Sequence, residues 1–108
     1  MIAVISPLSA NAMSRGVAIS AGSFFAAATR CEAENLITPG QADHLLNALA
    51  PYLSKSDKAN MMAGGARGAK DSQVFVEAEK KWLTFTPDAT GCYHVQSVLD
   101  DYKAQLGE

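Results

Sequence analysis

The chain has 108 residues with a net charge of −2, and 48% of its residues are hydrophobic. This length suits a single domain, and this hydrophobic content is typical of a folded protein rather than a disordered one. Its nine basic residues form no run, so the sequence argues against binding to nucleic acid or to anionic lipid. No apolar stretch reaches the roughly 20 residues of a transmembrane helix, so we expect no membrane insertion.

Residues 1–12 carry the strongest targeting signal. The segment is apolar at first, then small and polar, and it ends in Ala10-Asn11-Ala12, the A-x-A pattern that signal peptidases cleave. The apolar run is short and no Lys or Arg precedes it, which a start inside the true signal would explain. We therefore expect a signal-peptide remnant at residues 1–12 and a single helical domain at residues 13–108. The alternative is a short N-terminal strand or a loose tail.

The apolar pattern predicts a first helix over residues 14–35 and a second that starts after Thr38 and runs on through Leu53. The buried stripe of the first helix follows the i, i+4, i+7 spacing and consists of Val17, Ala21, Phe24, Ala28 and Cys31. The run Thr38-Pro39-Gly40-Gln41 predicts a helix start, with Thr38 as the cap and Gln41 completing a capping box. Pro51 should kink or end the second helix, because its ring removes an amide donor.

A third helix is expected to begin near residues 54–57 and to be weakened by Gly64, Gly65 and Gly68. Whether residues 54–82 form one helix or two stays open, because the chain can break near Asp71 and restart at Ser72. Helical spacing returns after that point in Val74, Phe75, Ala78 and Trp82.

The last helix is expected over residues 88–106, after a short extended stretch at residues 83–85. Thr86-Pro87-Asp88 again supplies a capping residue and a first-turn proline. The buried stripe of this helix is the cleanest in the chain and consists of Cys92, Val95, Leu99, Tyr102 and Leu106. The fold class that we expect is all-α, a small bundle of four to five helices closed by one disulfide.

Cys31 and Cys92 are the two cysteines of the chain, and they fall on the buried stripes of the first and last helices. In an exported chain such a pair predicts a disulfide, and with it a periplasmic or secreted location. A bridge that closes about 60 residues would stabilise the fold by roughly 4 kcal/mol in the chain-entropy model. The alternative is a pair of buried free thiols in a cytosolic protein.

The sequence predicts no catalytic, cofactor or metal site. The glycine-rich residues 64–70 invite comparison with a phosphate-binding loop, but the Ser or Thr that follows the lysine of a P-loop is absent. Close packing of two helices or a flexible turn is the simpler interpretation. His44 and His94 are too few for a zinc site made of histidines. Copper binding by Met61 and Met62 is a weaker hypothesis than gap-filling in the core.

Trp82 and Tyr93 lie near the loop between the last two predicted helices. Large aromatic rings left partly exposed there would form a partner-binding surface. The alternative is a core tryptophan that seals the end of the bundle.

From these observations we expect a non-enzymatic exported protein that binds another protein, as inhibitors, immunity proteins and stress chaperones do. A homo-oligomer is compatible with this hypothesis. An enzyme that uses His94 or His44 is the weakest hypothesis. In size and cysteine usage, though in no motif, the chain resembles small one-disulfide helical proteins of bacterial periplasms. The second hypothesis is a small-ligand or metal carrier with an inter-helix pocket lined by Met61, Met62, Phe75 and Trp82.

Overall fold

The computed structural model describes residues 13–107, so the expected signal remnant at residues 1–12 lies outside the described residues. The described part is mostly helical, and a disulfide joins Cys31 to Cys92, which confirms the expected fold class. A small two-stranded sheet is added to the helices. In chain order the elements are α2 (Arg15–Ala33), α3 (Gln41–Leu49), the 3₁₀ turn η1 (Ala50–Tyr52), α4 (Lys55–Asp71), β1 (Gln73–Val76), the 3₁₀ turn η2 (Glu77–Glu79), β2 (Lys81–Thr84) and α5 (Ala89–Leu106).

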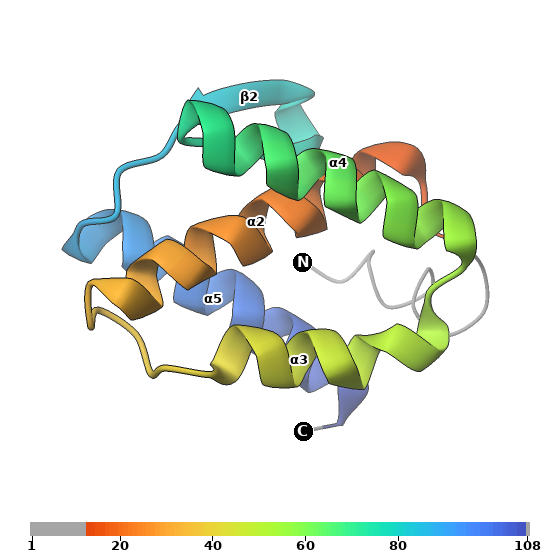
Figure 1. The fold of residues 1–108 in the computed structure, drawn as a ribbon, viewed down its shortest axis with the longest axis horizontal. Coiled ribbons are helices and arrows are strands. Elements are labelled where there is room, and N and C mark those ends of the chain that lie inside the picture. The colour runs from red at the N-terminus through yellow and green to blue at the C-terminus, as the bar shows by residue number, and fades with distance from the viewer. Residues whose placement is uncertain (1–12, 108) are drawn as a thin grey trace.

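Helix α2 runs through the middle of the molecule, with α4 along one side of it and α3 and α5 on the other (Figure 1). The hairpin of β1 and β2 packs beside α2 and α4. Leu45 and Leu49 of α3 and Val95 and Leu99 of α5 are almost fully buried. The core therefore lies between α2, α3 and α5, where the disulfide is also placed. None of the described helices is both long and apolar enough to span a membrane.

The start of α3 differs from the expected capping box. Its cap is Gly40, which adopts the left-handed conformation with φ of 86°, and Thr38 makes no cap. The carboxylate of Glu32 in α2 accepts hydrogen bonds from the N–H groups of Gly40 (2.9 Å) and Ala42 (3.0 Å). A side chain from the preceding helix therefore satisfies the first amides of α3, and local spacing does not reveal such a partner.

The other helix starts follow the sequence more closely. Ser54 and Asp57 form a reciprocal capping box at α4, with both hydrogen bonds at 3.0 Å. Helix α5 is capped by Asp88, whose carboxylate accepts from the Gly91 N–H at 2.8 Å. Pro87 therefore precedes the helix, so the prediction that it lies in the first turn was wrong. Helix α3 ends just before Pro51, as expected.

Residues 72–84 form a β-hairpin and not the helical restart that the spacing suggested, so that prediction was wrong. Ser72 and Lys80 both adopt the left-handed conformation with φ of 55°, which ends α4 and turns the hairpin. β1 carries two valines and a phenylalanine, residues that fit a pleated surface better than a helix. Antiparallel pairing places Phe75 opposite Trp82, with ring centroids 5.3 Å apart.

The glycines of α4 permit close contact between its backbone and that of α2. A Cβ atom on Gly64 would lie 2.2 Å from the carbonyl oxygen of Ile19, and one on Gly22 would lie 1.9 Å from that of Met61. Neither distance is possible for real atoms, so these positions exclude any side chain. Close helix packing, one of the two interpretations of residues 64–70, is confirmed.

Gly64→Ala should therefore destabilise the protein, although alanine favours helix formation. The new methyl group forces α2 and α4 apart, and we expect the free energy of unfolding to fall by about 1–3 kcal/mol in urea denaturation. Ala63→Gly, on the exposed side of the same helix, should cost only the propensity difference of about 1 kcal/mol. Stabilisation by Gly64→Ala would contradict the close packing.

Candidate functional site

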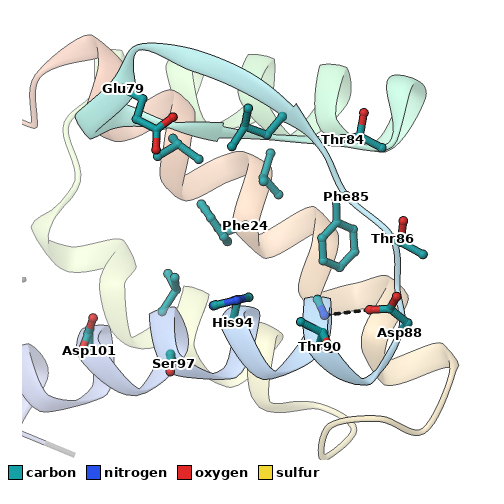
Figure 2. A pocket seen from close by; sticks show the side chains of 15 residues that line it. Phe24, Glu79, Thr84, Phe85, Thr86, Asp88, Thr90, His94, Ser97 and Asp101 are labelled. Carbon is teal, nitrogen blue, oxygen red and sulfur yellow. Dashed lines mark hydrogen bonds between the residues drawn. The ribbon is translucent and has the colours of Figure 1, made fainter.

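An open apolar groove lies between the hairpin and α5 and has a volume of about 650 Å³. Figure 2 shows the hairpin along one side, α5 along the other, and Phe24 of α2 behind them. The apolar residues that line the groove are Phe24, Val74, Val76, Leu83, Phe85 and Val98. Leu83 is 39% exposed and is one of the large apolar side chains at the surface. The groove therefore presents apolar surface that no described residue covers fully.

The hairpin register decides which of its side chains face the groove. Side chains alternate between the two faces of a strand, and Val74 lies opposite Leu83 on the groove side. Phe75 and Trp82 form the next pair and belong to the other face. There the guanidinium of Arg67 from α4 lies 4.3 Å from the Trp82 ring centre. Trp82 thus fixes the hairpin to α4 and does not line the groove.

Hydrogen bonds from α2 hold β1 in place. The buried Ser23 hydroxyl accepts from the Phe75 N–H at 2.9 Å and donates to the Ser20 carbonyl at 2.8 Å. The Ser72 hydroxyl donates to the Phe85 carbonyl at 2.8 Å, and Arg30 donates to the same hydroxyl. The hairpin wall of the groove is therefore attached to α2 through Ser23 within β1 and through Arg30 at the open end of the hairpin.

Helix α5 forms the opposite wall, and the disulfide ties it to α2. The Cα atoms of Cys31 and Cys92 are 5.8 Å apart. The face of α5 that carries Cys92 is buried, and the groove face lies beside it with Thr90, His94 and Val98. Both walls of the groove therefore take their position from the same helix, α2.

The outer edge of β2 is available for backbone hydrogen bonds. The Phe75 N–H points away from β2 toward Ser23, so Phe75 and Trp82 form a pair without mutual hydrogen bonds. Trp82 and Thr84 then direct their N–H and C=O groups away from β1, and within residues 13–107 no other element bonds to them. β2 runs along the outside of the fold (Figure 1).

The charged residues that line the groove are acidic. Glu79 lies near the hairpin turn, Asp101 on α5 and Asp88 at the far end of the connecting segment (Figure 2). No Lys or Arg is among the lining residues. Burial raises the pKa of Tyr102 to about 12, and the negative charge of neighbouring Asp101 adds to this. His94 also lines the groove, but its side chain is exposed, and its ring contacts that of Tyr93.

The residues expected to form a partner surface, Trp82 and Tyr93, lie beside the groove rather than in it. Trp82 is half-buried and Tyr93 is 71% exposed. Their chain neighbours Leu83 and His94 line the groove. If residues 81–84 had been predicted as a strand, the alternation of its side chains would have identified Leu83 as a groove residue. The helical interpretation of residues 72–82 prevented this prediction.

The residues expected to line a carrier pocket occupy different places. Met61 and Met62 border a separate depression of about 280 Å³ between α2, α3 and α4, which Phe75 and Trp82 do not line. His44 is exposed on α3. Within residues 13–107 no three His, Cys, Asp or Glu side chains are grouped to hold a metal ion. Both cysteines are in the disulfide, so neither provides a nucleophilic thiol.

Ser23→Ala should loosen the hairpin without removing core volume. The Phe75 N–H would lose its acceptor, and we expect the free energy of unfolding to fall by about 1–3 kcal/mol, with faster amide exchange at Phe75 in NMR. The exposed Ser56→Ala on α4 serves as the control and should change stability by less than about 0.5 kcal/mol. Unchanged exchange at Phe75 would show that this bond does not hold β1.

Comparison of the chain with protein-family models, with curated proteins and with solved structures found no match. No relative therefore contributes a site or an activity to the argument. The features of the described residues that bear on function are the apolar lining of the groove, its acidic residues and the outer edge of β2.

Proposed function

We propose that this chain is a small exported protein that binds a segment of another protein in the groove between the hairpin and α5. The observation that carries the proposal is the apolar lining of an open groove on a protein of this size. A groove lined by apolar side chains offers a place where the apolar side chains of a partner can be buried. An open strand edge beside it supplies the backbone groups that peptide recognition uses.

The disulfide supports the proposed location. Paired cysteines persist in oxidising compartments and are rare in the cytosol, which agrees with a periplasmic or secreted protein. The bond also supports a non-enzymatic role, because it removes both thiols from chemistry. Inhibitors, immunity proteins and stress chaperones are the classes of binding protein that fit this description.

A small-ligand carrier is the second candidate, and the groove volume favours it. About 650 Å³ lies within the range of roughly 300–1,000 Å³ that small-molecule pockets occupy. The lining that would receive such a ligand is Phe24, Val98 and the hairpin valines, not the methionines of α4. Native mass spectrometry of protein from its own host distinguishes the two, because a carrier shows a bound mass that denaturation removes.

Selection from a phage-displayed library of random 12-residue peptides tests the proposal. We expect the selected peptides to lose about fivefold in affinity for Leu83→Ser, because this side chain contributes apolar area at the groove. Leu36→Ser is a matched control, because Leu36 is 43% exposed and lies outside the groove. Equal affinity for both variants, measured by fluorescence polarisation, would place peptide binding elsewhere and contradict the proposal.

A further inference from the structure

We infer that the segment bound in the groove is extended, apolar on one face and positively charged at its ends, and that it pairs with β2 as an added strand. This inference rests on the proposed function and specifies the partner. Two separate features lead to it. One is the backbone edge of β2, which no other element in the described part of the chain pairs with, and the other is the set of carboxylates among the residues that line the groove.

The backbone edge sets the conformation of the partner segment. Trp82 and Thr84 present their N–H and C=O groups outward, and an extended chain about 4.8 Å away can bond to both. Such a chain would lie beside Leu83, along the mouth of the groove. A helical segment leaves these polar groups without partners, so the edge favours a strand.

Alternation along the added strand sets its apolar face. Every second side chain would lie on the same side of the sheet as Val74 and Leu83, which is the side of the groove. These side chains would face the groove, whose lining includes Phe24 and Val98, so valine, isoleucine or leucine would suit them. The intervening side chains would lie on the face of Trp82 and are not restricted by the groove.

The carboxylates set the charge of the segment. Glu79 and Asp101 lie toward one end of the groove and Asp88 toward the other (Figure 2). Within residues 13–107, Glu79 and Asp101 have no ion-pair partner, and the Asp88 carboxylate accepts a bond from the Gly91 N–H. Lys or Arg at the ends of a bound strand would pair with these carboxylates, whereas acidic ends would be repelled by them.

Two synthetic peptides test the charge. The first is Lys-Thr-Val-Thr-Val-Thr-Lys, and the second carries Glu in place of both lysines. We expect the lysine peptide to bind at least about fivefold tighter at low salt, since each surface ion pair contributes modestly. The double variant Glu79→Gln with Asp101→Asn should remove this preference. The control Glu34→Gln with Asp100→Asn changes the net charge equally away from the groove lining and should keep it.

Backbone N-methylation tests the added strand. In a paired strand, alternate N–H groups point toward β2 and the others point away. We therefore compare a peptide that is N-methylated at its two valines with one that is N-methylated at the flanking threonines. We expect one of the two to lose about tenfold in affinity and the other to keep its affinity. This holds for either direction of the added strand.

The outcomes separate the inference from the proposed function. Equal binding of the lysine and glutamate peptides, or equal loss with both methylation patterns, overturns the inference. If library-selected peptides still depend on Leu83 in that case, the groove remains a binding site for a different kind of segment. If the lysine peptide does not bind while the library-selected peptides do, the inference is overturned and the proposed function stands.

Discussion

The disulfide between Cys31 and Cys92 is the constraint on which the rest of the structure depends. It fixes the first turn of α5 to the last turn of α2, while Ser23 fixes β1 to the same helix. The two walls of the groove come from segments that are adjacent in the chain but are held by different bonds to α2. One helix, α2, therefore positions both walls of the groove.

The hairpin has different surroundings on its two faces and at its two edges. One face packs Phe75 and Trp82 toward Arg67 of α4, and the other contributes Val74 and Leu83 to the groove. On the β1 edge the Phe75 N–H donates to Ser23 of α2, and within residues 13–107 the β2 edge has no hydrogen-bond partner. An exposed strand edge can pair with other chains. Here the edge lies beside apolar and acidic side chains, and these restrict which segments can bind to it.

Much of the helical fold could be predicted from the sequence, whereas the groove could not. The stripe through Val95 and Leu99 and the placement of both cysteines determine α5 and the disulfide, because burial repeats at helical spacing. The hairpin was not predicted because its apolar residues also match helical spacing over a short run. The left-handed backbone of Ser72 and Lys80, which ends α4 and turns the hairpin, cannot be recognised from that spacing. The groove forms between this hairpin and α5. The order of residues within either element does not show that the two lie side by side.

The most direct test of the account is a ¹⁵N NMR titration of the oxidised full chain with the lysine-ended peptide. The account predicts that the largest amide shift changes occur at Trp82 and Thr84 and along the groove face of α5, around His94 and Val98. Changes concentrated instead at Met62 and the depression between α2, α3 and α4 would contradict it.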